Sequence, residues 1–245
     1  MKEKRFFYVP NADVETQFPP DEAMHALRSL RLKSGDNIYL MDGEGSFYQA
    51  EITIAATKHC MYEVKERLPQ KKGWRGRIHI AMAPTKMMDR VEWVAEKATE
   101  LGVDELSFLS CKFSERKAMR TTRLERIVVS AMKQSRKPWR PVVNPLTSFK
   151  DFVRAQRTGH KFIAHCYEQM QRDDLFTILK SPQVALSDDD ITVLIGPEGD
   201  FSEEEIRMAT DNGYRSITLG NARLRTETAA LSALMMAQLT RRTDE

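Results

Sequence analysis

Two glycine-containing motifs near the C-terminal end have the residue types needed to build a ligand pocket from backbone groups. Residues 194–201 read LIGPEGDF, and residues 219–229 read LGNARLRTETA. Each motif begins in an apolar run that is typical of a buried strand, and then turns at a glycine. Glycine has no side chain, so backbone N–H and C=O groups can approach a ligand closely. If the two strands lie side by side in one sheet, their ends predict a shared pocket.

The residues around these turns favour a neutral or cationic ligand over a phosphate. Glu198 and Asp200 follow Gly196, and no basic residue comes directly after it. The spacing of Gly196 and Gly199 differs from the three-glycine dinucleotide fingerprint, and the sequence contains no GxxxxGK[ST] phosphate loop. On spacing alone, two tight strand–helix turns without any ligand remain an alternative.

The start of the last predicted helix contains one residue that helix capping does not explain. Thr226 is a candidate N-cap, and Glu227 suits the positive end of the helix dipole. A cation at that end opposes the dipole, so Arg225 needs a partner, either an anionic ligand or Glu227. This mismatch favours a functional role for Arg225.

Strands and helices alternate after Arg77, and this predicts an α/β fold with a parallel sheet covered on both faces. Apolar runs predict strands at residues 78–83, 105–109, 161–165, 191–195 and 216–219. Apolar periodicity predicts helices at about 91–101, from 122, from 202 and at about 227–239. Gly102 should end the first of these helices, and capping boxes are predicted at Thr122 and Ser202, each with a glutamate three residues later.

The first part of the chain has the pattern of a small β-rich domain. Strands are predicted at residues 37–41, 47–54 and 61–66, with a helix at 21–32. The sequence DGEG at residues 42–45 predicts the turn of a hairpin. Residues 68–76 are polar with proline and glycine, as in a linker. We therefore expect one domain at residues 1–70 and a second at residues 74–245.

The composition is that of a soluble globular protein. The chain has 245 residues, of which 30% are charged and 41% hydrophobic, and no apolar run approaches the ~18 residues of a membrane span. The first residues lack the apolar core of a signal peptide. Three cysteines lie far apart without metal-ligand spacing, so we expect reduced thiols, a cytoplasmic location and no bound metal.

The net charge of +3 conceals a strongly basic stretch. Residues 112–140 contain ten Lys or Arg and two Glu, a local charge of +8. A concentrated positive charge on an otherwise acidic chain favours a polyanionic partner such as nucleic acid. A solvated helix face is the alternative.

The two glycine motifs resemble those of the RsmE family of SPOUT-class methyltransferases, and weaker matches follow in the same order along the chain. The matching segments are RFF at 5–7, His25, LR at 27–28 and 30–31, DG at 42–43, KATELGV at 97–103, QS at 134–135, GPEG at 196–199 and LRTETA at 224–229. The chain departs from the family at Asp200, which is often glycine, and at Lys133 and Lys137, where glutamate and arginine are common.

The resemblance implies transfer of a methyl group from S-adenosylmethionine to N3 of a uridine in small-subunit (16S) ribosomal RNA. It implies a PUA-like β-barrel joined to an α/β domain whose C-terminal part forms a trefoil knot. It also implies a homodimer with the cofactor pocket near the subunit interface. By resemblance, the cofactor is held by Leu194, Gly196, Glu198, Gly199, Leu219, Gly220, Leu224, Thr226, Thr228 and Ala229. His165 either lines the same pocket or serves only the fold.

The implied reaction needs a way to handle the proton on uracil N3. The enzyme must remove that proton or stabilise the resulting anion, and must align N3 with the methyl carbon. Arg225 is the candidate for stabilising negative charge on the uracil oxygens. Glu198 is a candidate base, with cofactor binding or backbone anchoring as alternatives. No metal is required.

The position of N3 on the Watson–Crick edge implies that the substrate uridine is unpaired or flipped out. The basic stretch would then bind RNA, and Trp139 would either stack on a base or pack against the fold. The predicted RNA-binding residues are Arg5, Arg28, Arg31, Arg116, Gln134, Ser135, Arg136, Lys137 and Arg140. Two other functions remain open: a non-catalytic RNA-binding assembly factor, and a different α/β enzyme acting on a small nucleotide.

Overall fold

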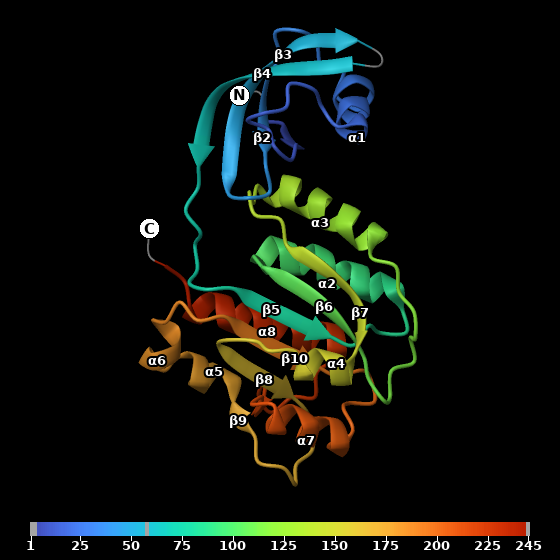
Figure 1. Cartoon of the computed structure of the whole chain (residues 1–245), viewed down its shortest axis with the longest axis vertical. Coiled ribbons are helices and arrows are strands. Elements are labelled where there is room, and N and C mark those ends of the chain that lie inside the picture. Colours follow the sequence, from blue (N-terminus) through green and yellow to red (C-terminus); the bar gives the residue numbers. More distant parts are fainter. Residues whose placement is uncertain (1–3, 57–58, 244–245) are drawn as a thin grey trace. The chain divides into compact units, whose positions relative to one another are not determined.

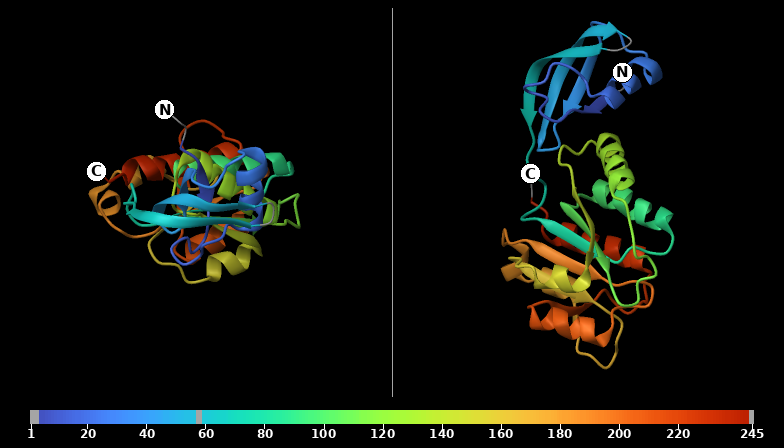
Figure 2. Two further views of the ribbon diagram at one scale, coloured as in Figure 1. Left: turned by 90° about the horizontal axis from the view of Figure 1, so that it is seen from above. Right: turned by 45° about the vertical axis from the view of Figure 1, so that its right-hand side comes forward.

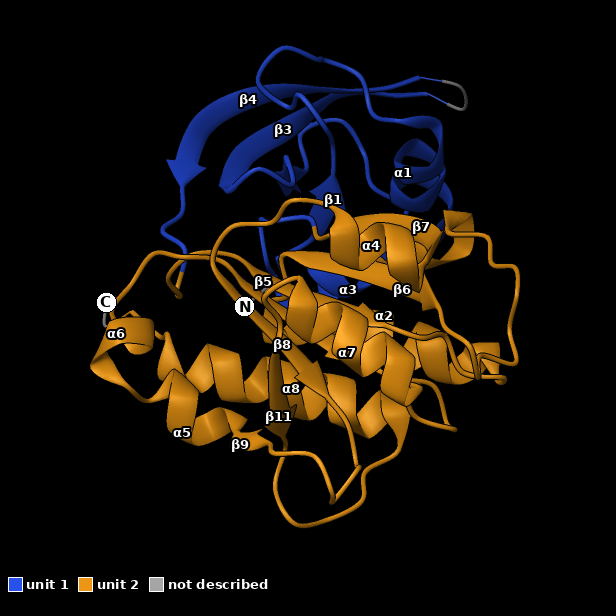
Figure 3. Ribbon diagram, turned by 60° about the horizontal axis from the view of Figure 1, so that its bottom comes forward, with its two compact units in different colours: residues 1–72, 129–140 blue, residues 73–128, 141–245 orange. Residues whose placement is uncertain are grey.

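The computed structural model describes residues 4–56 and 59–243, and its contacts divide the chain into two compact units (Figure 3). Unit 1 comprises residues 1–72 and 129–140, and unit 2 comprises residues 73–128 and 141–245. Helix α3 (Thr122–Ser135) therefore starts in unit 2 and ends in unit 1. Residues 129–140, which carry part of the basic stretch, belong with the N-terminal residues despite the long sequence separation.

Unit 1 is built on a four-stranded sheet in the order β1-β2-β3-β4. Its strands are β1 (Phe6–Tyr8), β2 (Asn37–Met41), β3 (Ser46–Ala56) and β4 (His59–Pro69). The three predicted strands are confirmed, and β1 is an addition that pairs parallel to β2. The predicted helix at 21–32 forms as α1 (Pro20–Met24) followed by a π-helical turn (His25–Ser29).

The predicted hairpin turn at residues 42–45 is confirmed, and a carboxylate stabilises it. One oxygen of Asp42 accepts hydrogen bonds from the backbone N–H groups of Glu44 and Ser46 at 2.7 and 3.0 Å. The other oxygen accepts one from the hydroxyl of Tyr48 at 3.1 Å. Alternate side chains of β2 and β3, including Ile38 and Ile52, form the core of the unit.

Unit 2 contains a seven-stranded sheet in the order β7-β6-β5-β10-β8-β11-β9 (Figure 1). Its strands are β5 (Ile78–Met82), β6 (Glu105–Ser110), β7 (Val142–Ser148), β8 (His160–Ala164), β9 (Asp173–Asp174), β10 (Ile191–Ile195) and β11 (Arg215–Thr218). Every pairing is parallel, as predicted, and the five predicted strands are confirmed. The sequence pattern missed β7 and β9, because edge strands need no continuous apolar run and β7 contains Pro145.

Helices cover both faces of this sheet (Figures 1 and 2). They are α2 (Met88–Leu101), α4 (Phe149–Arg154), α5 (Leu175–Leu179), α6 (Pro182–Ala185), α7 (Glu203–Asp211) and α8 (Thr226–Thr240). Helices α4 and α7 pack on the face to which Ala81, Ile163 and Leu194 point. Helices α2 and α8 pack against each other, and α8 contacts β5 and β10. None of the helices in residues 4–56 and 59–243 is long and apolar enough to cross a membrane.

The predicted helix ends are confirmed at two places and wrong at two. Gly102, with φ 95°, ends α2, and Ser202 and Glu205 form the capping box of α7. The box predicted at Thr122 does not form, because α3 already begins there and the hydroxyl of Thr121 contacts Glu125 at 3.4 Å. Thr226 is likewise the first residue of α8, and its N-cap is Arg225.

Candidate active site at the carboxyl ends of the strands

The carboxyl ends of several strands in unit 2 meet at one edge of the sheet. Ile195 of β10 is paired with Met82 of β5 and with Ala164 of β8. Ala164 is also paired with Ile217 of β11. The strands β10 and β11 therefore flank β8, which corrects the expectation that they lie side by side. His165, the residue that follows β8, falls between the two glycine turns.

A cavity of about 990 Å³ opens at these strand ends. Its wall contains the turn after β10, the loop between β11 and α8, and the residues that follow β8. Nine of the predicted site residues line it: His165, Gly196, Glu198, Leu219, Gly220, Leu224, Arg225, Thr226 and Ala229. The two motifs thus contribute to one pocket, as the sequence predicted.

Three of the predicted cofactor residues lie outside the wall of this cavity. Leu194 is fully buried in the hydrophobic core. Thr228 is exposed on α8. Gly199 lies beside Phe113, and an added Cβ there would come within 3.2 Å of the Cβ of Phe113. None of these three residues lines the cavity.

Thr226 joins the two glycine motifs. Its hydroxyl donates a hydrogen bond to the backbone carbonyl of Gly196 at 3.1 Å, and Thr226 is buried. This bond ties the start of α8 to the end of β10. Gly220 allows the intervening loop to turn, because its φ of 112° lies in the left-handed region that favours glycine.

Glu198 lines the cavity and also holds the loop after β5. Its Oε1 accepts a hydrogen bond from the backbone N–H of Lys86 at 3.0 Å. Arg116 holds the same loop, because its guanidinium donates to the carbonyls of Thr85 and Lys86 at 3.2 and 2.5 Å. The predicted phosphate-binding residue Arg116 is therefore half-buried and already bonded to backbone groups.

Asp200 stands where glycine is common in the family, and its backbone and side chain both reflect this difference. Asp200 has a φ of 66°, a conformation that glycine adopts more readily than aspartate. Its two carboxylate oxygens accept hydrogen bonds from the backbone N–H groups of Cys166 and Phe201, both at 2.7 Å. Asp200 thereby links the loops after β8 and β10, an interaction that glycine could not make.

His165 is a buried polar side chain in the wall of the cavity. It is 4% exposed, and neither ring nitrogen has a hydrogen bond within the described part of the chain. Burial lowers the pKa of His165; the carboxylate of Asp200 opposes this shift and the guanidinium of Arg172 adds to it. The ring is therefore neutral at neutral pH, and it offers a ligand one donor and one acceptor.

The charged residues at the start of α8 have different surroundings. The carboxylate of Glu227 lies 3.1 Å from the guanidinium of Arg90 on α2, and among the described residues no ion pair joins it to Arg225. The exposed guanidinium of Arg225 makes no hydrogen bond or ion pair with any described residue, and Arg225 lines the cavity. The sequence interpretation missed Arg90, although it lies in the first turn of α2 and opposes a helix dipole just as Arg225 does.

Comparison with known proteins decides the family. Residues 72–238 match the family described as RNA methyltransferase domain, and residues 18–60 match the RNA methyltransferase PUA domain. The chain belongs to this RNA methyltransferase family. The resemblance drawn from the two glycine motifs is therefore confirmed, as is the fold class of a PUA domain followed by an α/β methyltransferase domain.

Three relatives of this methyltransferase match it over most of its length. Ribosomal RNA small subunit methyltransferase E of Rickettsia conorii is 26% identical over 221 residues, 89% of this chain and 87% of that protein. The structure of a probable rRNA-methyltransferase from Porphyromonas gingivalis is 39% identical, with a TM-score of 0.84 and coverage of 97% and 98%. A Ribosomal RNA small subunit methyltransferase E from Neisseria gonorrhoeae, bound to S-adenosyl methionine, is 26% identical, with a TM-score of 0.79 and the same coverage.

Eight of the nine predicted RNA-binding residues of the methyltransferase belong to unit 1: Arg5, Arg28, Arg31, Gln134, Ser135, Arg136, Lys137 and Arg140. The five arginines and Gln134 are exposed, Ser135 and Lys137 are half-buried, and burial lowers the pKa of Lys137. The unit thus gathers exposed cations from two distant segments of sequence.

Aromatic side chains accompany the cations of residues 136–140. The guanidinium of Arg136 lies 5.5 Å from the ring centre of Phe6, and that of Arg140 lies 5.8 Å from Tyr8. Trp139 packs against the hairpin of unit 1, where an added Cβ at Gly45 would come within 2.7 Å of its indole nitrogen. This contact supports packing, the second of the two roles considered for Trp139.

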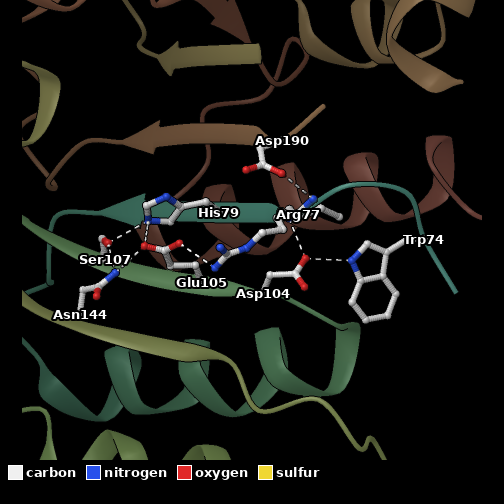
Figure 4. Close-up of polar contacts among 9 residues, drawn as sticks. Trp74, Arg77, His79, Asp104, Glu105, Ser107, Asn144 and Asp190 are labelled. Atoms are coloured by element: carbon white, nitrogen blue, oxygen red, sulfur yellow. Dashed lines mark hydrogen bonds and ion pairs between the residues drawn. The ribbon is translucent and has the colours of Figure 1, made fainter. Parts of the chain in front are cut away.

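A second polar cluster of the methyltransferase lies at the opposite, amino ends of the strands (Figure 4). The Nε2 atom of His79 lies 2.8 Å from Oγ of Ser107, and Asn144 donates to that oxygen at 2.9 Å and to Glu105 at 2.7 Å. Arg77 donates to Glu105 at 3.2 Å. Burial lowers the pKa of His79 to about 3, and the positive charges of Arg157 and Arg77 add to the shift. These groups bond to one another, which indicates a structural role.

Proposed function

We propose that this protein transfers a methyl group from S-adenosylmethionine to N3 of a uridine in small-subunit (16S) ribosomal RNA. The observation that carries the proposal is the cavity of about 990 Å³ in which the two glycine motifs meet, with Thr226 bonded to Gly196. The names of the relatives support the ribosomal substrate, and the bound S-adenosyl methionine of the Neisseria gonorrhoeae protein supports the cofactor.

The residues of the cavity fit this cofactor. Both ring nitrogens of His165, a residue of the cavity wall, are buried and have no hydrogen-bond partner among the described residues, so they can bond to a ligand. Backbone groups of Gly196, Leu219 and Gly220 line it and can bind a purine and a ribose at close range. The turn after β10 places Glu198 and Asp200 nearby, which suits a positively charged sulfonium. Bound there, S-adenosylmethionine supplies an electrophilic methyl group.

Arg225 is the residue that we assign to the uracil. Its guanidinium has no partner among the described residues, although its position at the N-cap of α8 opposes the helix dipole. A uracil that loses its N3 proton carries negative charge on its oxygens, and a guanidinium in hydrogen-bond range stabilises that charge. For Glu198 we propose anchoring of the loop after β5, because its Oε1 is bonded to the N–H of Lys86.

Unit 1 provides the proposed RNA surface. Its exposed arginines would bind phosphates, which requires no particular sequence in the RNA. The uridine itself must be unpaired or flipped out, since N3 lies on the Watson–Crick edge. We further propose that the enzyme acts in the cytoplasm as a homodimer, on RNA within the small ribosomal subunit.

The deciding experiment measures methyl transfer. Purified protein, labelled S-adenosylmethionine and ribosomes that lack the modification should give labelled 16S RNA, with the methyl group mapped to N3 of one uridine. Calorimetry with S-adenosylmethionine separates this function from a non-catalytic assembly factor. Cofactor binding without transfer to ribosomal RNA, or no binding at all, would contradict the proposal.

The RNA surface has its own test. Replacing Arg136 and Lys137 together with alanine should weaken RNA binding and lower the slope of log affinity against log salt by about 1–2, because each phosphate contact contributes about 0.7–0.9. Arg116→Ala is the comparison, since its guanidinium is bonded to backbone carbonyls and should change the slope less. An unchanged slope in the double variant would remove residues 136 and 137 from the RNA surface.

A further inference from the structure

The first turn of α8 contains a buried carboxylate whose role is unexplained by the assignments above. Glu227 is 8% exposed and lines the cavity. Its Oε1 lies 3.1 Å from Nη1 of Arg90. Its other oxygen, Oε2, is buried and has no hydrogen-bond partner among the described residues. Because an unsatisfied buried carboxylate oxygen is costly, a hydrogen-bond donor on a ligand is the natural partner for Oε2.

Helix capping does not account for this oxygen. A carboxylate in the first turn of a helix is favoured by the dipole and usually accepts a backbone N–H, whereas Oε2 accepts none. Glu203 also lies in the first turn of a helix, α7, but it is exposed and pairs with Arg207 at 3.2 Å. Glu203 is also outside the wall of the cavity. Burial and position at the cavity therefore distinguish Glu227.

The pair of Glu227 and Arg90 matches the edge of uracil that carries N3. That edge presents an N–H donor between two carbonyl acceptors. A carboxylate oxygen can accept from N3–H while a neighbouring guanidinium donates to one of the carbonyls. Arg90 lines the same cavity and is partly exposed, so its remaining N–H groups are accessible to a ligand.

Resting on the proposed function, we propose that Glu227 Oε2 accepts the N3 proton of the substrate uridine and that Arg90 donates to an adjacent uracil oxygen. The N3–H bond breaks and its proton moves to Oε2. The electron pair left on N3 forms the bond to the methyl carbon, and the electrons of the carbon–sulfur bond stay on sulfur. The products are N3-methyluridine, a neutral thioether and the carboxylic acid of Glu227, which returns its proton to water.

The main experiment compares Glu227→Gln with the wild type on undermethylated ribosomes. The amide keeps an oxygen for Arg90 but cannot take a proton. We expect kcat to fall by about 10²–10⁴-fold, the usual contribution of a general base, while calorimetric affinity for S-adenosylmethionine changes by less than about threefold. The alternative ligand for Oε2 is the ammonium group of the cofactor, and a parallel loss of cofactor affinity and kcat would overturn the assignment in its favour.

The pH profile provides a measurement that a purely structural role would not change. At higher pH more of the uridine loses its N3 proton without help, so the deficit of Glu227→Gln should shrink by up to tenfold per pH unit between about pH 7 and 9. A deficit that stays constant with pH would overturn the proposal.

Other charged side chains line the same cavity as Glu227. They are Arg90, Glu168, Arg172, Glu198, Asp200, Arg223 and Arg225.

Two further groups of the cavity, the His165 ring and the Cys166 thiol, are of types that usually titrate near this pH range. Burial lowers the pKa of His165 and keeps the ring neutral. Burial raises the pKa of the Cys166 thiol above its ordinary value. Neither therefore imitates the rescue expected for Glu227→Gln.

Two variants keep the test conclusive. Glu203→Gln removes a glutamate that is also paired with an arginine in a first helical turn, and it should leave kcat unchanged. If Glu227→Gln does not fold, Glu227→Asp should retain a proton acceptor, with reduced kcat and a wild-type pH profile. A Glu227→Asp enzyme that shows the high-pH rescue would contradict the proposal. Wild-type enzyme that transfers no methyl to ribosomal RNA would instead refute the proposed function.

Discussion

The two ends of the parallel sheet in unit 2 each contain a buried histidine, and the partners of the two rings differ. At the amino ends, His79 contacts Ser107, and Asn144, Glu105 and Arg77 continue the network. At the carboxyl ends, His165 has no hydrogen bond to either ring nitrogen from any described residue.

Burial lowers the pKa of both histidines, so a lowered pKa alone does not identify a site. What separates the two histidines is that the ring of His79 contacts other polar side chains, whereas that of His165 has no hydrogen bond from any described residue. Satisfied groups stabilise the structure, and unsatisfied groups beside a cavity leave bonds for a ligand. Changes at the carboxyl end should therefore alter the reaction, and changes at the amino end should alter stability.

Among the changes that test this comparison, the loss of Arg225 should have the largest effect. We expect Arg225→Ala to lower kcat for methyl transfer by about 10²–10³-fold, the range measured when one donor to a developing negative charge is removed. Affinity for S-adenosylmethionine, measured by calorimetry, should stay nearly unchanged. Equal losses of affinity and of kcat would show that Arg225 binds the cofactor instead of stabilising the uracil.

A smaller effect, a loss of cofactor affinity, should follow when the hydrogen bond between the two glycine motifs is removed. Thr226→Val removes the hydroxyl that donates to Gly196 and leaves a buried carbonyl unpaired, at a cost of about 1–3 kcal/mol. We expect cofactor affinity to fall roughly tenfold, as measured by calorimetry. Thr228→Val is the matched control, because Thr228 is exposed on the same helix and outside the cavity wall. Equal effects of the two substitutions would argue against the link.

Substitutions at the two histidine sites should have different effects, one on the stability of the fold and the other on cofactor affinity. Ser107→Ala removes the group that contacts Nε2 of His79 and should lower the free energy of unfolding by about 1–3 kcal/mol, with kcat unchanged. His165→Phe removes a ring that has no hydrogen bond from any described residue, so the melting temperature should change little while cofactor affinity falls. If His165→Phe destabilised the protein as much as Ser107→Ala, the contrast between the two ends would be wrong.

A further prediction concerns acid stability. Because burial holds the pKa of His79 at about 3, below the ordinary value of 6.5, the unfolded chain binds a proton that the folded chain does not. The stabilisation is fully present above pH 6.5 and is lost as pH falls toward about 3, by at most about 1.4 kcal/mol per pH unit. Denaturation at several pH values should show a shallower loss for His79→Gln. An identical pH dependence would exclude His79 as the titrating group.

The local sequence pattern was sufficient to predict much of the fold and part of the site. The apolar runs predicted β5, β6, β8, β10 and β11 to within about one residue, because buried parallel strands have few polar positions. The glycine turns and Arg225 were also evident, since a left-handed turn and a cation at a helix N-terminus are local properties. Edge strand β7 and the short strand β9 lack the apolar run and left no comparable signal.

The sequence by itself determined the family, the alternation of strands and helices, and the two motifs that meet at the cavity. Only the tertiary structure decided which groups meet there. Strand order placed β8 between the two motifs, so His165 lies among them. Helix packing brought Arg90 of α2 to Glu227 and left Arg225 without a partner among the described residues. It also assigned residues 129–140 to unit 1. Long-range pairing depends on which surfaces bury each other, and no local sequence pattern encodes that choice.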